Sequence, residues 1–468
     1  MTDSAVAETC RLTVRAPSVT IDLAVPADVP VADLLPTLLR YVGEEAEEAG
    51  LDHAGWVLQR LGDAPLDEET TLARAGLADG AVLHLRPHTE ALPEARLDDL
   101  VDGMAETVGR RLHTWHAGAA RGLLVGTAVA TVATALVMVF RPGVTDSAAT
   151  RAACAAVAGV LLLAGAGSAS RAVGDRLSAS ALGLLVAPCF ALVGWVLPGG
   201  DLSGPDASQV AGARLLAAGA AAAGGAVLAL AATAVGAPAL LATAVVAVAT
   251  AVSGALMGYT NLDAAASVAL VATVVALAAG AVAPFAFKLA GMRMPALPSS
   301  AGQLQEGIDP YAGDEVAERT ELAGRWVTAL FAATGTVVAA ALAVLAHTPD
   351  LPETLTALAL ALLLLLHARG LVHIGQRLTL AVPGVLGLLL LARAWAVDSD
   401  ADGRVVVFAV LLAAAAALVT ASWIVPGRRV LPYWGRAAEL AHTGFAVALL
   451  PLALWVAGLF GWLRGLFG

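Results

Sequence analysis

Charge is scarce in this 468-residue sequence, and the scarcity decides its class. Charged residues make up 14% of the chain and hydrophobic residues 59%, whereas soluble globular proteins carry about 25% charged residues. Residues 1–118 hold 21 Asp/Glu and 9 Lys/Arg, while residues 119–468 hold 17 and 18. We therefore expect an acidic soluble head followed by a nearly neutral membrane region. An acidic head argues against nucleic acid and anionic lipid as its partners and fits a basic protein surface better.

Motifs that carry chemistry are also missing. The three cysteines, Cys10, Cys154 and Cys189, form no CxxC pair or Cys/His cluster, which excludes the usual zinc and redox motifs. The sequence holds no Ser/His/Asp set, P-loop or glycine-rich phosphate loop. We expect no enzyme activity, no catalytic residue, no cofactor and no bound metal. The N-terminus lacks the basic and apolar regions of a signal peptide, so the head is expected to stay in the cytoplasm.

Two local patterns suggest metal binding and fail on spacing. Asp398–Gly403 resembles the start of a calcium loop, but the twelfth position is Ala409, where such a loop needs glutamate. His367 and His373 are six residues apart, which would place them on different faces of a helix. We interpret the first as a solvated turn and the second as part of a basic helix end.

Long apolar runs fill the second part of the chain. A membrane-spanning helix needs about 20 mostly apolar residues. Eleven stretches qualify, at roughly 121–140, 152–170, 179–197, 213–234, 238–258, 264–286, 326–346, 354–368, 376–395, 404–425 and 438–462. None carries Asp, Glu, Lys or Arg near its centre, and Glu439 and His442 fall at an end. Ion-coupled carriers keep an ionisable group at depth, so the pattern disfavours that class.

One polar stretch, residues 288–325, interrupts these runs after the sixth. A polar loop of this length must lie in water, because its backbone groups would have no partners in hydrocarbon. With the head inside, fourteen Lys/Arg fall on the inner side and six on the outer side. This distribution follows the positive-inside rule. It predicts a cytoplasmic loop 288–325 and an extracytoplasmic C-terminus.

Small residues recur at helical spacing within the spans. Pairs of the small-xxx-small type permit close helix packing in membranes. With 47 glycines in the chain, such pairs also arise by chance, and both readings stay open. The pairs are Gly122/Gly126, Gly254/Gly258 and Gly461/Gly465.

The head has the pattern of a small α+β domain. Strands are predicted at 11–15, 19–25, 56–62 and 82–86, and a helix is predicted between the second and third. Its apolar positions recur from Val31 to Val42, the acidic run Glu44–Glu48 forms its solvated end, and Gly50 is its expected stop. The order ββαββ is that of the β-grasp, and the segment from Leu66 to Pro87 resembles ubiquitin-like domains. A small α+β domain of another type is the alternative. The chain continues past Pro87, which excludes a conjugated ubiquitin-like protein.

Residues 97–115 are predicted to form an amphipathic helix, with apolar residues on one face. Trp115, Arg110 and Arg111 suit the membrane interface. Packing of the apolar face on the head is an equal alternative.

The combination of head, spans and loop resembles EccD, the polytopic core component of type VII (ESX) secretion systems. The loop segments Met294–Ser299, Gln303-Leu304 and Ile308–Pro310 are similar to the proline-bearing segment of that family. The resemblance implies a structural role without catalytic residues. It also implies dimerisation, assembly with EccB, the EccC ATPase and EccE, and export of WXG-type proteins driven by EccC.

The sequence thus predicts an α-helical polytopic membrane protein with about eleven transmembrane helices and an N-terminal β-grasp domain in the cytoplasm. Its parts are expected at 1–90 (ubiquitin-like domain), 91–118 (amphipathic linker), 119–287 (six helices), 288–325 (loop) and 326–468 (five helices). Expected partners are EccB-, EccC- and EccE-like components, a second copy of the chain and membrane lipids, and not nucleic acid. The alternative is a stand-alone transporter or lipid-handling permease with a regulatory head. Candidate partner contacts are Pro295, Pro298, Gln303, Asp309, Pro310, Arg110 and Arg111.

Overall fold

The chain folds into two compact units in a computed structural model. The first comprises Met1–His116 and is termed the head, and the second comprises Ala117–Gly468 and is termed the membrane unit. The structure describes residues 9–17, 19–42, 55–61, 63–77, 79–88, 117–141, 147–260, 262–292, 313–348, 350–424 and 432–467.

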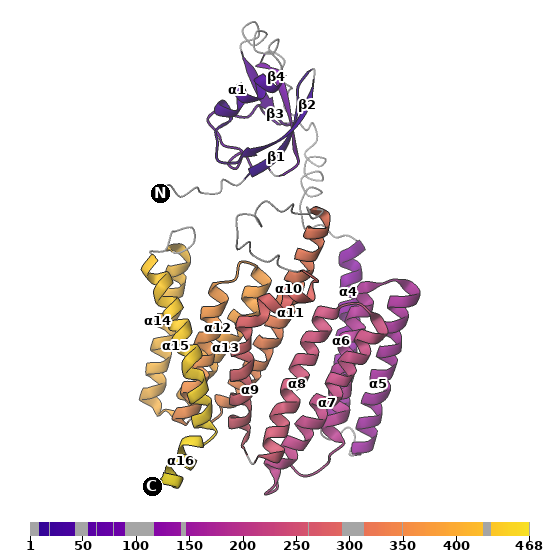
Figure 1. Cartoon of the computed structure of the whole chain (residues 1–468), viewed down its shortest axis with the longest axis vertical. Coiled ribbons are helices and arrows are strands. Elements are labelled where there is room, and N and C mark those ends of the chain that lie inside the picture. Colours follow the sequence, from indigo (N-terminus) through magenta and orange to yellow (C-terminus); the bar gives the residue numbers. More distant parts are fainter. Residues whose placement is uncertain are drawn as a thin grey trace, which may run out of the picture. The chain divides into compact units, whose positions relative to one another are not determined.

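The head is a four-stranded sheet with one helix packed on it (Figure 1). Its elements are β1 (Thr9–Arg15), β2 (Thr20–Pro26), α1 (Val31–Val42), β3 (Trp56–Gln59) and β4 (Ala81–Pro87). The strand order is β2-β1-β4-β3, in which the central pair β1–β4 is parallel and the outer pairs are antiparallel. This is the β-grasp arrangement, so the predicted fold of the head is confirmed.

Alternating apolar residues give the sheet one buried face. Leu12 and Val14 of β1 and Leu83 and Leu85 of β4 are buried in one core. α1 covers that face with apolar residues at helical spacing, namely Val31, Leu34, Leu35 and Leu38. Burying each such side chain contributes about 1.5–3 kcal/mol before entropy is subtracted. The apolar residues that recur every second position in the strands and about every 3.6 positions in the helix therefore pack in one core.

The membrane unit is entirely helical in its described part. Eleven helices there are long and apolar enough to cross a membrane, which confirms the predicted number. They are α4 (Ala117–Phe140), α5 (Ala148–Ser168) continued by η2 (Ala169–Val173), α6 (Arg176–Val196), α7 (Ala207–Thr233), α8 (Ala237–Tyr259), α9 (Ala264–Ala278) continued through η3 (Ala279–Ala281) into α10 (Val282–Leu289), α11 (Gly313–Leu345), α12 (Leu351–Arg369), α13 (Ile374–Asp398), α14 (Ala401–Ile424) and α15 (Pro432–Val456). A shorter helix, α16 (Leu459–Phe467), follows α15.

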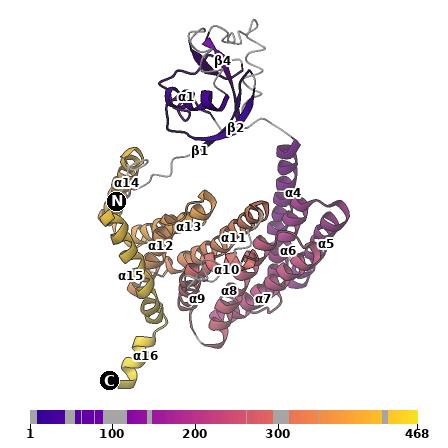
Figure 2. The ribbon, with the colours of Figure 1, turned by 45° about the horizontal axis from the view of Figure 1, so that its top comes forward.

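The spans pack in two groups (Figures 1 and 2). α5, α6, α7 and α8 pack in sequence order, each on the next. α9, α11, α12, α13 and α15 share a core rich in leucine, in which Leu342, Leu360 and Leu364 are almost fully buried. α11 contacts α8 of the first group as well as α9 of the second, so it joins the two groups.

The interval 288–325, predicted to be a loop, is helical at both of its ends. α10 continues to Leu289, and α11 already begins at Gly313. Ion pairs at i,i+4 spacing, Glu315–Arg319 and Glu321–Arg325, stabilise the first turns of α11 in a polar setting. The charges that suggested a loop therefore belong in part to a solvated helix end.

The last predicted span, 438–462, is displaced from the observed helix. α15 begins at Pro432, because proline suits the first position of a helix. The helix ends at Val456, and Gly458 adopts a positive φ of 76° before α16 begins. His442, expected at a span end, therefore lies inside α15.

Glycine allows α7 and α8 to pack closely. A Cβ atom added at Gly254 would overlap the backbone nitrogen of Leu216, and one added at Gly212 would lie 2.8 Å from the nitrogen of Gly258. Gly219 is equally crowded by Ala251. By contrast, Cβ atoms at the glycines of the first and third predicted pairs would meet no described atom within 4 Å; these are Gly122, Gly126, Gly461 and Gly465.

An ion pair connects α4 to the start of α6. The guanidinium of Arg121 lies 2.5 Å from the carboxylate of Asp175, which also caps α6 by accepting hydrogen bonds from the backbone N–H groups of Leu177 and Ser178. The hydrogen bond from Arg121 and those from Ser178 hold the pKa of the Asp175 carboxyl far below its usual range. α4 buries none of its residues fully, and Val132 and Leu136 pack partly buried against the bundle. The ion pair adds a polar contact between α4 and the start of α6.

The close contact at Gly254 predicts that two glycine-to-alanine variants of α8 differ in stability. Gly254→Ala adds a methyl group where α7 leaves no room, and overpacking of this kind costs about 1–3 kcal/mol. Gly258→Ala adds the same group where no described atom lies within 4 Å, so it gains helix propensity without a clash. We expect a lower thermal unfolding temperature in detergent micelles for Gly254→Ala alone. Equal temperatures for the two variants would contradict the contact.

The Arg121–Asp175 pair predicts a defined pH dependence. A carboxyl group with a lowered folded-state pKa stabilises the protein fully above the unfolded pKa of about 3.9 and loses that effect as the pH falls below it. Asp175→Asn keeps a helix cap but removes the charge. We expect wild type to lose its stability advantage over this variant between about pH 5 and pH 2. The check is thermal unfolding of both proteins across that range, with Arg121→Gln in each background; parallel profiles would rule the ion pair out.

Candidate functional site

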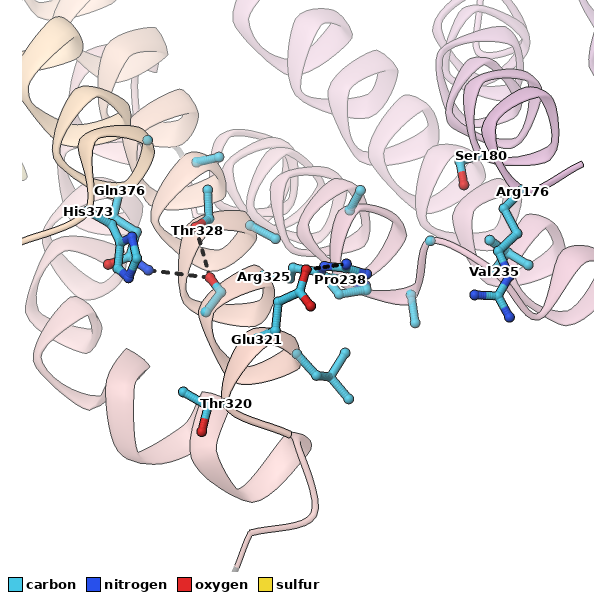
Figure 3. A pocket seen from close by; sticks show the side chains of 18 of the residues that line it. Arg176, Ser180, Val235, Pro238, Thr320, Glu321, Arg325, Thr328, His373 and Gln376 are labelled. Carbon is cyan, nitrogen blue, oxygen red and sulfur yellow. Dashed lines mark hydrogen bonds and ion pairs between the residues drawn. The ribbon is translucent and has the colours of Figure 1, made fainter. Parts of the chain in front are cut away.

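A groove of about 1250 Å³ lies where the two helix groups meet (Figure 3). One wall comes from the first turns of α6 and from the α7–α8 turn, and the other from the first half of α11 and the start of α13. Figure 3 shows Arg176, Val235 and Pro238 on the first side and Thr328, His373 and Gln376 on the second. The groove is thus built from four stretches that are far apart in the sequence.

The α7–α8 turn is held in place by η2, the short helix that follows α5. Ala234 and Gly236 adopt left-handed backbone conformations, with φ of 51° and 69°, which lets the chain reverse in three residues. The last carbonyl groups of α7 find partners in η2: the Ser170 hydroxyl donates to the Thr233 oxygen at 2.6 Å, and the Arg171 guanidinium donates to the Ala231 oxygen at 2.9 Å. Carbonyl groups at a helix end need such partners when water is scarce.

Polar side chains gather at one end of the groove. Glu321 and Arg325 of α11 form an ion pair with an N–O distance of 2.6 Å. Gln376 is buried, and its amide nitrogen lies 3.4 Å from the carbonyl oxygen of Gly324. Arg176, the first residue of α6, is exposed on the opposite wall. The rest of the lining is mainly apolar, with alanines of α8 and α11 and the side chain of Leu177, and it also includes the hydroxyl residues Ser180, Thr320 and Thr328.

A second, smaller cavity of about 700 Å³ adjoins the groove and shares Arg176, Glu321, Leu322 and Arg325 with it. There Arg319 donates to the carbonyl oxygen of Gly291 at 3.0 Å and pairs with Glu315. These contacts tie the start of α11 to the end of α10. Two of the acids that line the cavity, Glu315 and Glu321, are thus paired with arginines of α11, and Glu318 and Arg176 also line it.

The candidate partner contacts named from the sequence are not among the described residues. Arg110 and Arg111 fall in 89–116, as does the whole predicted amphipathic helix 97–115, and the loop candidates fall in 293–312. The loop candidates are Pro295, Pro298, Gln303, Asp309 and Pro310. Their role stays a prediction. The groove was not found from the sequence, because no local pattern links its four stretches.

The histidines are arranged differently from the expectation. His367 and His373 do not share a helix: His367 lies near the end of α12, and His373 directly precedes α13. His367 instead approaches His442 of α15, with 3.4 Å between Nδ1 and Nε2, and packs edge-on against Phe331 of α11. Within the described residues, no three His, Cys, Asp or Glu side chains are placed to hold one metal ion.

The head has a basic sheet face despite its acidic composition. Arg11 and Arg15 of β1 alternate with the buried residues of that strand and therefore lie on the outer face. His84 and Arg86 of β4 lie on the same face by register. The one acid on the described strands, Asp22 of β2, accepts a hydrogen bond from the Thr13 hydroxyl. The net acidic charge of the head is therefore not spread over this face, because composition carries no information on which side of a sheet a residue lies.

Both units match known protein families. The membrane unit matches the EccD-like transmembrane domain over residues 120–466. The head matches the family described as WXG100 protein secretion system (Wss), protein YukD, over residues 9–85. The ubiquitin-like domain and the membrane region predicted from the sequence therefore correspond to two separate family matches.

Individual relatives are similar over different lengths. The ESX-4 secretion system protein eccD4 of Mycobacterium tuberculosis, in strains CDC 1551 / Oshkosh and ATCC 25618 / H37Rv, is 38% identical over 95 residues. This match spans 20% of the chain and only 20% of that relative's length. Protomer 1 of the ESX-3 core complex aligns over 97% of this chain and 99% of that chain, with 18% identity and a TM-score of 0.55.

A second solved structure gives the same result for the fold. A chain of the MycP5-free ESX-5 inner membrane complex, State II, aligns over 88% of this chain and 99% of that chain, with 21% identity and a TM-score of 0.58. At such identities the likeness shows the fold alone. Because the EccD-like match covers most of its length, this multi-pass membrane protein belongs to the EccD family, as the resemblance of its sequence predicted.

Proposed function

We propose that this chain is a structural membrane-platform subunit of a type VII protein secretion complex. The observation that carries the proposal is the EccD-like match over residues 120–466, joined in one chain to a YukD-type head. The two similar structures are chains of an ESX-3 core complex and an ESX-5 inner membrane complex, which supports a role within an assembly.

The packing of the spans supports assembly as the mechanism. Helices in lipid associate through close van der Waals contact, since no hydrophobic force drives them together. The described contacts between α7 and α8 are of this kind, with glycine at each crossing. The spans that bury few of their residues, α4 and α14, offer apolar surface to lipid or to other membrane helices. The proposed role is therefore to hold neighbouring subunits in place and not to catalyse a reaction.

The finer parts of the proposal concern partners and orientation. The partners are EccB- and EccE-like membrane components, an EccC-like ATPase and a second copy of this chain, and the exported proteins are of the WXG type. The head lies in the cytoplasm and the C-terminus outside. The excess of Lys/Arg on the side of the head supports this orientation.

Purification from the native membrane tests the platform role. We expect a tagged full-length chain in mild detergent to be recovered in a large complex with a P-loop ATPase of the EccC type, because its function depends on assembly. The measurements are native mass and identification of the co-purifying chains, with an untagged strain as control. A stable monomer or simple dimer without an ATPase in several detergents would instead support a stand-alone permease.

Cysteine labelling in intact cells tests the orientation. In a variant without the three native cysteines, Ser203→Cys in the α6–α7 turn is expected to react with a membrane-impermeant maleimide. Glu318→Cys in the first turns of α11 is expected to react only after the cells are opened. Both positions are exposed, so a difference between them reports the side of the membrane. The reverse labelling pattern would overturn the proposed orientation.

A further inference from the structure

The groove between the helix groups joins apolar walls to a charged end. Its apolar lining includes Ala239 in the first turn of α8 and Ala329 and Ala332 of α11. At its mouth the side chains of Leu177 and Leu322 are 47% and 37% exposed. A groove lined in this way is filled by an apolar chain more favourably than by water.

The polar end holds a cation that is free to bind a ligand. In the described part of the chain, the Arg176 guanidinium has no hydrogen-bond or ion-pair partner. The neighbouring carboxylate, Asp175, is occupied by Arg121, and Glu321 across the groove is occupied by Arg325. An arginine beside an apolar groove favours an anionic group, with which it forms charge-assisted hydrogen bonds.

Two helix starts at the same end add to the positive potential. α8 begins after Gly236 and α13 begins after His373, and neither helix has a side-chain hydrogen bond to its first N–H groups. Both residues line the groove. Uncapped N-termini carry a partial positive charge and favour phosphate. The start of α6 differs, because the Asp175 carboxylate already caps it.

The position of the charged end fits a lipid. α6, α8 and α13 all begin at this end, so it lies where these spans leave the hydrocarbon and enter the headgroup region. From there the groove follows α11 as far as Ala332, beside the first turns of α6 and α8. A soluble anion would leave the apolar walls uncovered, and a purely apolar molecule would leave Arg176 without a partner.

We propose that the groove is a binding site for one anionic phospholipid. Its phosphate group pairs with Arg176 near the starts of α8 and α13, and an acyl chain lies between α8 and α11. The groove volume of about 1250 Å³ exceeds the range of about 300–1,000 Å³ usual for small-molecule pockets, as a lipid chain requires. A lipid at this site would contact both helix groups and hold them at a fixed spacing.

Lipid retention by the full-length protein tests the site. The protein is purified in mild detergent, incubated with equal amounts of phosphatidylglycerol and phosphatidylcholine, and analysed by native mass spectrometry. Wild type is expected to retain one phosphatidylglycerol in preference to phosphatidylcholine. Arg176→Gln is expected to reduce that retention about tenfold, since it removes a charge-assisted contact. Arg377→Gln is the matched control, because Arg377 is exposed near the start of α13 but does not line the groove.

A second variant probes the apolar wall. Ala329→Phe fills the groove and is expected to lower retention of both lipids, while Arg176→Gln lowers only that of phosphatidylglycerol. Unfolding temperature and elution volume show whether each variant is folded.

Equal retention of the two lipids by wild type, or equal losses in Arg176→Gln and Arg377→Gln, would overturn the proposal. Loss of a co-purifying protein from Arg176→Gln with unchanged lipid retention would assign the groove to a protein partner. Because the readout is lipid mass on the isolated chain, the result is independent of the platform role.

Discussion

Close approach of helix backbones is the constraint on which the membrane unit depends. In hydrocarbon, apolar side chains gain little by leaving lipid, so helices must gain stability from contact at short range. α7 and α8 achieve this with Gly212, Gly219 and Gly254, each of which faces the backbone of the other helix. The second group also uses glycine, because Gly335 of α11 is crowded by the carbonyl group of Thr379 on α13. The larger leucines then fill the space between helices that these crossings have fixed.

The same constraint governs the polar groups that the spans contain. Three buried hydroxyl groups are satisfied within their own helix: Thr233 donates to the Ala229 carbonyl, Ser253 to Ala249 and Thr334 to Leu330. Such bonds leave no demand on a neighbouring helix. The buried hydroxyl groups of Ser267 and Thr273 in α9 have no such bond among the described residues. Charged side chains serve helix ends, as Arg171 does for α7 and Asp175 for α6. These charged side chains therefore lie at the ends of the bundle and not in its interior.

Much of this organisation could be predicted from the sequence, because it follows from local patterns. The spans are long apolar runs, and the predicted division between 213–234 and 238–258 was correct although the gap is short, since Ala234 and Gly236 form a turn before Pro238. The head was recognisable from strand alternation and the period of α1. Relations between distant segments could not be predicted. His367 contacts His442 because α12 packs on α15. Arg176 of α6 lies in the same groove as α11 because α8, which also lines that groove, packs on α11.

The errors near residue 313 and at α15 share one physical cause. Charged residues were interpreted as marking loops or span ends, yet a helix continues through them where water is available. Glu315, Arg319, Glu321 and Arg325 pair along α11, and Arg436 and Glu439 lie within the first turns of α15. Membrane helices therefore extend beyond the apolar run that identifies them. These extensions carry the charged residues that would be unfavourable within the hydrocarbon. Sites for polar partners therefore arise at the helix ends, where ends from both helix groups meet.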